Sequence, residues 1–590
     1  MTEKLNTDFN KYPHVEVQGL DGQAFEGWGR IGEELKVSLK KIKGERQLVL
    51  VECYQGVHDD ELLRELQNIL EPARVFLSRD YFLPEDKILE ISHPDLTDHR
   101  IFGYMTRRSM DELMDPAKVD SFSKDLGEIR QGCMLVYGPG ASLLCPEPDI
   151  FIYADMARWE IQLRMRKNEV NNLGISNKKD GLETLYKRGF FFDWRICDRL
   201  KKENMQQWDF VLDTNTPGHP KMLRAEALLR GLEQTVQRPF SLVPYFDAGP
   251  WGGYWMKEVC GLDPEMVNSA WCFNCVPEEN SLYLQFGKIR FETPSINLVF
   301  YQSRKLLGEA VQARFGDEFP IRFDFLDTMG GGNLSLQVHP LTEYIQEKFG
   351  MHYTQDESYY LVDAGKDACV YLGLKEGIAP AEMIRDLKKS ERKSVRFPDE
   401  KYVNQWPAKK HDHFLIPGGT VHCSGKNSMV LEISATPYIF TFKLWDWGRL
   451  GMDGKPRPIN INHGEQVIQW ERDTKWTEKN LINRIETVTE SEGWKEEKTG
   501  LHEREFIETR RHWFSDKVHH NTNGGVQVLC LVQGKAAIVE SPTEAFSPFV
   551  VHFAETFVVP AAVGEYTIRP YGEPETEECA TIKAFVRTNA

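Results

Sequence analysis

A short run in the middle of the chain places three polar side chains at the spacing of one strand face. Residues 330–340 read GGGNLSLQVHP, and alternation along a strand puts Ser335, Gln337 and His339 on the same side. Inside a barrel, such a row could hold a metal ion or a polar substrate. On the outer face of an edge strand it would only meet solvent, and the run alone leaves both interpretations open.

Two later segments supply the groups that would complete a metal site. Glu357 begins a β-rich run, and His422 follows a Gly-Gly turn in PGGTVH (417–422). Together with Gln337 and His339 they offer two imidazoles, one carboxylate and one amide oxygen. This set suits Zn²⁺ and leaves room for substrate or water, and Mn²⁺ or Fe²⁺ could use much the same ligands. Because all four lie in strand contexts that would converge in a barrel, the metal interpretation is favoured.

The region that carries these residues reads as β structure from about residue 240 onward. Short apolar runs between Gly and Pro turns predict strands at 280–286, 333–338, 358–362, 368–374, 413–416 and 429–433. A second series follows at 526–532, 535–539, 556–559 and 567–568. Strands spaced in this way predict a β-sandwich or barrel. We expect the charged stretch 470–511 to join two of them.

A faint internal repeat indicates that the two barrels are related. The segments FLIPGGTVH (414–422) and FVVPAAVGE (557–565) each read as a strand, a turn and a continuation. The first ends on a histidine and the second on a glutamate, so we expect the second barrel to lack a metal. We interpret His519 and His520 as surface residues. His411 and His413 could point into the first site, but an outward orientation is at least as well supported.

Residues 1 to about 240 follow a different pattern. Strands at 47–53 and 149–155 and helices at 59–70 and 156–168 alternate, which predicts an α/β layer structure with a mostly parallel sheet. The run VYGPGAS (136–142) and a helix with Arg158, Arg164 and Arg166 are similar to nucleoside and uridine kinases, in which such arginines lie near a lid. The turn at Gly56 lacks the GxxxxGK[ST] pattern and its phosphate-binding lysine. We therefore expect a degenerate P-loop-like fold, with the arginine helix either phosphate-binding or solvated.

Composition limits the classes of partner. The chain has 590 residues, of which 72 are Lys or Arg and 89 are Asp or Glu, for a net charge of −17. Such a surface repels polyanions, so nucleic acid is not an expected partner. No run approaches the roughly 18 apolar residues of a membrane span, and no signal peptide is evident. The 11 cysteines, with one CxxC at Cys272 and Cys275, are expected to be reduced thiols of a cytosolic protein.

The succession of motifs after residue 245 resembles the class I phosphomannose isomerases of the cupin superfamily. The motifs are PWGG (250–253), SLQVHP (335–340), IPGGTVH (416–422), LEI (431–433) and LWDWGR (444–449), in the family's order and spacing. The resemblance implies a metal-bearing cupin followed by a metal-free one. It assigns zinc binding to Gln337, His339, Glu357 and His422, contact with the substrate phosphate to Ser335, and catalytic positions to Glu432 and Arg449.

Two positions depart from the family pattern. Lys443 stands where the family has an arginine that is implicated in catalysis, which keeps the charge but loses the bidentate fork. Gln355 stands two residues before the metal-binding glutamate, where the family has a lysine that serves phosphate binding or proton transfer. Metal binding is expected to be intact, whereas mannose 6-phosphate as the substrate is what these changes put in question.

We therefore predict three parts: a kinase-like α/β domain at 1–240, a metal-binding cupin at 241–470 and a metal-free cupin at 471–590. The expected activity is metal-dependent interconversion of mannose 6-phosphate and fructose 6-phosphate through an enediol(ate), with Glu432 or Lys443 moving the proton. One alternative is a sugar-phosphate sensor that has lost turnover. A weaker one is a bifunctional kinase–isomerase.

Overall fold

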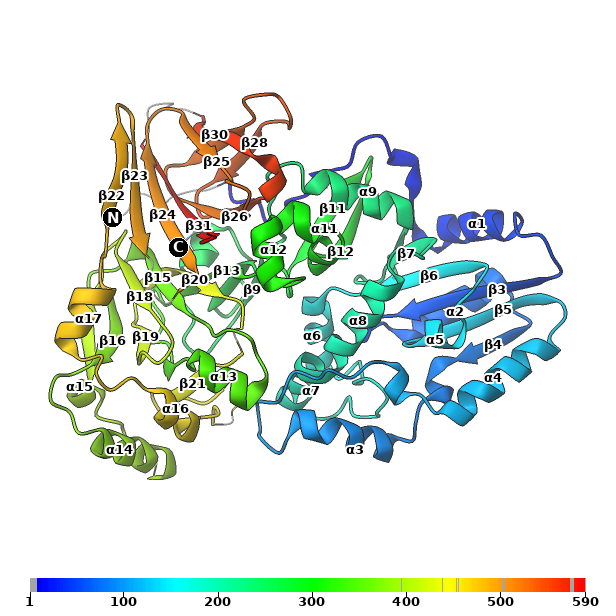
Figure 1. Ribbon diagram of the computed structural model, residues 1–590, viewed down its shortest axis with the longest axis horizontal. Helices are drawn as coiled ribbons and strands as arrows, with labels where there is room; N and C mark the ends of the chain where they lie inside the picture. Colours follow the sequence, from blue (N-terminus) through cyan, green and yellow to red (C-terminus); the bar gives the residue numbers. More distant parts are fainter. Residues whose placement is uncertain are drawn as a thin grey trace. The chain divides into compact units, whose positions relative to one another are not determined.

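The computed structural model describes residues 8–393, 395–437, 439–451, 454, 456–500, 505–572 and 578–588. The chain forms two units, each assembled from separate stretches of sequence (Figure 1). The α/β unit comprises His14–Gln234 and Ser281–Tyr301. The β unit comprises Met1–Pro13, Thr235–Asn280 and Gln302–Ala590.

The α/β unit is built on one seven-stranded sheet. Its strands, in spatial order, are β2 (Ala24–Glu26), β8 (Lys221–Arg224), β7 (Phe210–Asp213), β6 (Ile150–Asp155), β3 (Arg46–Cys53), β5 (Gly132–Gly138) and β4 (Arg74–Leu77). The five strands from β7 to β4 are parallel, and β8 is antiparallel to both of its neighbours, β7 and β2, which confirms the predicted α/β layer with a mostly parallel sheet. Connecting helices are α1 (Gly27–Leu39), α2 (Asp59–Leu70), α3 (Glu85–Leu96), α4 (Pro116–Glu128), α5 (Ala141–Leu144), α6 (Arg158–Arg166), α7 (Leu182–Arg188), α8 (Trp194–Asn204) and α9 (Ala225–Thr235).

The turn after β3 is filled by helix α6. A β-carbon on Gly56 would lie 2.8 Å from Ile161 Cγ1, and Arg164 Nη1 donates to the carbonyl of Gly56 over 2.8 Å. Arg158 is also buried and forms an ion pair with Asp198 at 2.9 Å. Both arginines thus bind protein groups inside the unit, so the expected solvated face is wrong for them, whereas Arg166 of the same helix is exposed. The expected phosphate contact stays a prediction. The kinase-like interpretation of this unit stays a prediction.

A segment from the middle of the chain completes the α/β unit. It contributes the hairpin β11 (Ser281–Phe286) and β12 (Ile289–Pro294), which forms a three-stranded sheet with β1 (Val15–Glu16). Helix α11 (Ile296–Leu307) follows. The strand predicted at 280–286 therefore forms, but it belongs to this unit rather than to the barrels, because its partners are β1 and β12.

The first barrel of the β unit is a pair of antiparallel sheets. One layer is β18 (His413–Ile416), β15 (Glu357–Ala364), β20 (Ser428–Ala435), β13 (Ile321–Asp327), β10 (Trp271–Cys275) and β9 (Tyr245–Asp247). The other is β17 (Val403–Pro407), β16 (Cys369–Leu374), β19 (His422–Ser424), β14 (Leu336–Val338) and β21 (Phe442–Trp445). Helices around them are α10 (Trp255–Val259), α12 (Glu309–Phe315), α13 (Thr342–Phe349), α14 (Pro380–Lys393), α15 (Asp399–Tyr402), α16 (Ile461–Val467) and α17 (Thr474–Leu481).

The second barrel repeats the two-layer plan. Its larger layer is β22 (Glu486–Ser491), β23 (Trp494–Gly500), β24 (Ile507–Phe514), β31 (Cys579–Val586), β26 (Gln527–Gln533) and β29 (Thr556–Val559). Its smaller layer is β25 (Val518–Asn521), β30 (Glu565–Pro570), β27 (Ala536–Glu540) and β28 (Phe549–His552). The stretch 470–511, expected as a connector, therefore contains α17, β22, β23 and most of β24. Strand β22 was not predicted, because every one of its residues is exposed and no alternation of apolar residues marks it.

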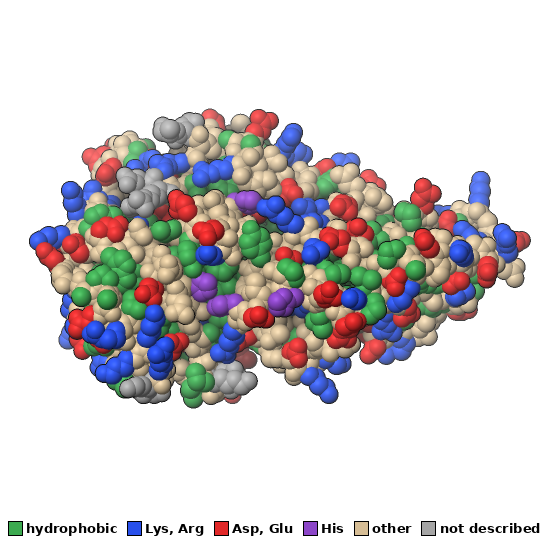
Figure 2. Space-filling view, turned by 60° about the horizontal axis from the view of Figure 1, so that its bottom comes forward, with side chains coloured by type: hydrophobic (Ala, Val, Ile, Leu, Met, Phe, Trp, Pro, Cys, Tyr) green, Lys and Arg blue, Asp and Glu red, His purple; other side chains and the backbone are tan. Residues whose placement is uncertain are grey.

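The surface mixes both signs of charge. On the face shown in Figure 2, Lys and Arg side chains are interspersed with Asp and Glu. All 11 cysteines are free thiols, and Cys272 and Cys275 are buried in β10. None of the helices in the described ranges combines the length and the apolar character that a membrane crossing requires.

Candidate metal centre

The centre of the first barrel collects polar side chains from both layers. Gln337 of β14 lies opposite His422 of β19 on one side and opposite Lys443 of β21 on the other. Residues paired across antiparallel strands project from the same side of the sheet, so these three side chains form one row. Glu357, at the start of β15, comes from the facing layer. The barrel interpretation of the polar run is therefore confirmed, and the edge-strand alternative is wrong.

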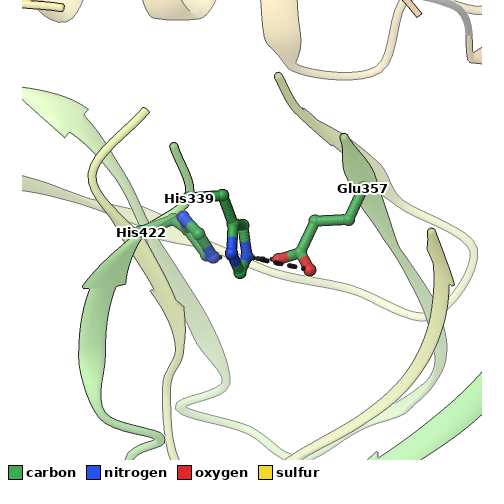
Figure 3. Close-up of side chains that lie close together, drawn as sticks. All are labelled: His339, Glu357 and His422. Carbon is green, nitrogen blue, oxygen red and sulfur yellow. Dashed lines mark ion pairs between the residues drawn. The ribbon is translucent and has the colours of Figure 1, made fainter. Parts of the chain in front are cut away.

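Three of these side chains converge on one point. His339 Nε2 lies 3.1 Å from Glu357 Oε2, and His422 Nε2 lies 2.9 Å from Glu357 Oε1. Figure 3 shows the two rings side by side, with the carboxylate aimed at them from the opposite strand. All three residues are at most 1% exposed. Their ligand atoms lie within 4.8 Å of one another, the only such His, Cys, Asp and Glu group among the described residues.

The arrangement fits a divalent cation. Although Glu357 Oε1 and His339 Nε2 are close to their neighbours, neither has a partner with hydrogen-bond geometry in the described part of the chain. Atoms aimed at a shared point, and not at one another, are what a coordination site requires. His422 Nδ1 lies 2.8 Å from the carbonyl oxygen of Thr420, a contact that orients the ring and leaves Nε2 for the ion. The amide of Gln337 reaches the same point, with Nε2 at 3.3 Å from His422 Nε2.

The histidines also set the charge of Glu357. Burial favours the neutral carboxyl, but the two imidazoles outweigh this effect and hold the pKa of Glu357 well below its usual value. The group is therefore an anion between two rings, the form in which it can bind a metal.

A second set of carboxylates lies beside the first. Gln355 Nε2 donates to Glu357 Oε2 over 3.0 Å and to Glu432 Oε1 over 3.2 Å, so the amide bridges the two acids. Arg322 forks between Glu432 Oε1 at 3.1 Å and Asp324 Oδ2 at 2.8 Å. Burial, followed by repulsion from Asp324 and Glu357, raises the pKa of Glu432 well above its usual value. Burial thus favours the protonated form of Glu432.

The sequence reasoning missed Arg322 and Asp324. They lie in β13, whose residues are all buried and whose sequence reads IRFDFLD. Two charges at alternate positions of an otherwise apolar strand were a usable signal, because buried charges need partners in the interior. Burial raises the pKa of Asp324 to about 7 against the opposing effect of Arg322.

Ser335 belongs to a third cluster, around Asp446. Its hydroxyl donates to Asp446 Oδ1 over 3.0 Å. Arg449 Nη2 binds the same carboxylate at 2.5 Å, and Arg457 Nη1 binds Asp446 Oδ2 at 2.8 Å. One hydroxyl and two guanidinium groups therefore meet here. Arg457 belongs to none of the motifs named in the sequence analysis, so no pattern marked it.

The remaining candidates lie away from this centre. Tyr360 OH lies 2.8 Å from His411 Nδ1, and the His413 ring packs edge-on against the Tyr360 ring. Along β15, Tyr360 lies on the opposite face from Glu357 and Tyr359. Its hydroxyl also accepts a hydrogen bond from Arg511 of the second barrel. Both histidines therefore point outward, the orientation that the sequence supported at least as well as the inward one.

Two comparisons by sequence cover different parts of the chain. A family model described as a domain of unknown function (DUF8485) matches residues 27–237. Mannose-6-phosphate isomerase ManA of Bacillus subtilis is 26% identical over 232 residues, which are 39% of this chain and 68% of that protein. Mannose-6-phosphate isomerase of Streptococcus mutans is 25% identical over 221 residues, 37% of this chain and 64% of that protein. The chain thus spans about two thirds of the length of these relatives.

Solved structures align with the chain at lower sequence identity. The mannose 6-phosphate isomerase of Bacillus subtilis aligns with 59% of this chain and 99% of its own, at 17% identity and a TM-score of 0.47. A zinc-bound mannose 6-phosphate isomerase aligns over the same share of this chain at 13% identity and a TM-score of 0.45.

Proposed function

We propose that the chain is a metal-dependent aldose–ketose isomerase that interconverts mannose 6-phosphate and fructose 6-phosphate. The observation that carries the proposal is the buried group of His339, Glu357 and His422, with Lys443 on the same face and paired with Gln337, which lies between it and His422. The names of the curated relatives, which are mannose-6-phosphate isomerases, support it.

The metal, for which Zn²⁺ is our first choice, would be held by Gln337, His339, Glu357 and His422. When bound, a divalent ion would polarise the sugar oxygens and stabilise the negative charge that develops on an enediol(ate). Isomerisation also needs one proton moved between C1 and C2. In this proposal Glu432, whose burial favours the protonated form, or Lys443, on the face of Gln337, would carry it.

The phosphate of the substrate would bind at the cluster around Asp446. The Ser335 hydroxyl and the guanidinium groups of Arg449 and Arg457 are donors of the kind that recognise phosphate oxygens. In this proposal Asp446 holds both arginines in position until the anion arrives. Arg457 is the member of this set that the motif comparison did not supply.

A coupled assay with mannose 6-phosphate tests the proposal. The purified chain should produce fructose 6-phosphate, lose this activity after treatment with a chelator, and regain it when Zn²⁺ is added back. Mn²⁺ in place of Zn²⁺ identifies the preferred ion. A metal-loaded protein that produces no fructose 6-phosphate would reject the isomerase.

A sensor without turnover is the second candidate, and the place of Gln355 favours it. Its neutral amide lies between Glu357 and Glu432, where the resembling family has a lysine. A protein that binds mannose 6-phosphate but isomerises it only after both Gln355→Lys and Lys443→Arg are made would be a sensor. Robust turnover by the wild type excludes it.

A further inference from the structure

The second barrel, expected to lack a metal, also encloses polar side chains. His512 of β24, His520 of β25 and Lys583 of β31 are 3%, 6% and 7% exposed. The expectation that His519 and His520 both lie on the surface is therefore wrong for His520. The two residues are adjacent in one strand, so if one faces solvent the other faces inward.

The strand register places these side chains inside the barrel. Lys583 is paired with Leu529, and His512 with Thr581, which also faces Leu531. Leu529 and Leu531 belong to the apolar core between the two layers. Because paired residues share one side of the sheet, Lys583, His512 and Thr581 project into the same interior.

The histidines are held by aromatic and acidic neighbours. The His520 ring stacks on Tyr566 with centroids 5.0 Å apart, and the His512 ring meets it edge-on at 4.5 Å. On its other side, His512 Nε2 lies 3.2 Å from Glu496 Oε1. Residues of both layers therefore fix the two rings, with His520 and Tyr566 from the smaller layer and His512 and Glu496 from the larger.

Several polar atoms in this interior have no partner. His512 Nδ1, His520 Nε2 and Thr581 Oγ1 make no hydrogen bond within the ranges that the structure describes. Each buried polar atom left without a partner costs about 1–3 kcal/mol, so three together in one interior need an explanation. Lys583 forms no ion pair with a described residue, whereas its neighbour Arg510 is paired with Glu508.

We propose that the interior of the second barrel binds a phosphate group between Lys583, Thr581 and the two histidines. Lys583 supplies a positive charge that no described carboxylate pairs directly. If His512 donates from Nε2 to Glu496, its Nδ1 is left as an acceptor. A protonated phosphate offers an O⁻ to the ammonium and an O–H to this nitrogen.

The charge of Lys583 favours an anion over a metal ion at the same histidines. Burial lowers the pKa of its ammonium to about 8, against the opposing effect of Glu496. A cation added between the two rings would lower it further, whereas an anion would stabilise the charged form.

Calorimetric titration of the full-length chain with inorganic phosphate tests the site. The wild type should bind phosphate saturably, and Lys583→Met should weaken this binding by about ten-fold or more, because it removes the charge. Thr581→Val should weaken it by about three-fold or more. This second variant keeps the shape of the side chain and removes an unsatisfied hydroxyl, so it should fold whether or not a ligand binds.

Matched variants separate this site from the metal centre. Lys535→Met makes the same change at an exposed lysine of the same barrel and should not alter phosphate binding. Arg457→Met, in the first barrel, should leave the Lys583-dependent binding unchanged whatever the fate of the proposed isomerase.

Two probes identify the source of the phosphate. Tighter binding of inorganic phosphate than of glycerol 3-phosphate assigns the site to the free ion, and the reverse assigns it to a phosphate ester. The proposal is overturned if the wild type shows no saturable binding of either probe up to about 10 mM. It is also overturned if folded Lys583→Met and Thr581→Val both bind phosphate as the wild type does.

Discussion

Among single residues, His339 offers the most direct test of the metal centre, since its ring nitrogens have no hydrogen-bond partner in the described structure. His339→Ala should lower bound divalent metal from about one ion per chain to well under a tenth of that, because imidazole and carboxylate ligands dominate the affinity. Mass spectrometry of the purified protein measures the content. His519→Ala, at an exposed histidine, should keep the wild-type metal content. Full metal content in His339→Ala would show that the ion is elsewhere.

Substitution of Lys443 should lower turnover and leave the metal content nearly unchanged. Its partner in the strand register is Gln337, so it shares the face of the metal ligands without being one. Lys443→Ala should reduce turnover about 100-fold, while the metal content changes less than about two-fold. Lys443→Arg should retain activity or raise it, since a guanidinium group adds a second parallel hydrogen bond.

Steady-state kinetics, with the metal content measured on the same samples, gives the comparison for Lys443. Lys426→Ala removes an exposed lysine that pairs with Asp367, and it should leave turnover unchanged. Turnover that is indifferent to Lys443→Ala would remove this residue from the mechanism and leave Glu432 as the remaining candidate.

At the scale of elements, helix α6 packs tightly against the turn between β3 and α2. Gly56 has φ +99°, and a β-carbon there would lie 2.8 Å from Ile161. Gly56→Ala should therefore destabilise the chain by about 1–3 kcal/mol. Gly127→Ala, in helix α4 with open space around it, should be neutral or stabilising by up to about 1 kcal/mol. Urea unfolding of both variants, followed by circular dichroism, checks the opposite signs.

The same packing bears on nucleotide binding. Ile161 and Arg164 pack against Gly56, and the sequence has no lysine of the P-loop type at this turn. Titration of the full chain with ATP should therefore show no tight binding. A micromolar affinity for ATP would mean that this turn opens.

Local sequence patterns predicted many of the helices and strands of this fold. The helix at 59–70 and the strand at 413–416 were predicted with the bounds that the structure shows, because their apolar residues repeat at 3.6 or two positions. The convergence of His339, Glu357 and His422 was predicted from their residue types and strand contexts, and the motif resemblance implied it as well. Pairings between distant segments were missed: Arg322 with Glu432, and β11 with β1. No periodicity encodes a partner more than 100 residues away.

For the molecule as a whole, the stability of the β unit should depend on pH through His411 and His413, whose side chains point away from the interior of the first barrel. Burial, together with Arg511, lowers the pKa of His413 to about 3. Burial, together with Lys410 and Arg511, lowers that of His411 to about 4. The unfolded chain takes up these protons below about pH 6.5 while the folded chain does not. Stability contributed by the neutral rings is therefore complete above that pH and is lost as the pH falls towards 4.

The expected size of this effect is set by His413, which is fully buried. Between pH 6.5 and pH 5 it should cost the wild type about 2 kcal/mol of unfolding free energy. His413→Leu should lose correspondingly less over the same interval, and His519→Leu should behave as the wild type. Urea titrations at the two pH values measure the difference, and identical slopes for wild type and His413→Leu would contradict the prediction.

The hairpin β11–β12 gives the chain an order of assembly. It pairs with β1, and Asn297, just beyond it, donates to Asp155 Oδ2 over 2.7 Å inside the α/β unit. During synthesis the α/β unit cannot close until residue 301 has left the ribosome, at about 5–20 residues per second. By then the first strands of the β unit, β9 and β10, have also emerged. A chain cut near residue 240 would therefore lack the hairpin β11–β12 and hold an incomplete α/β unit.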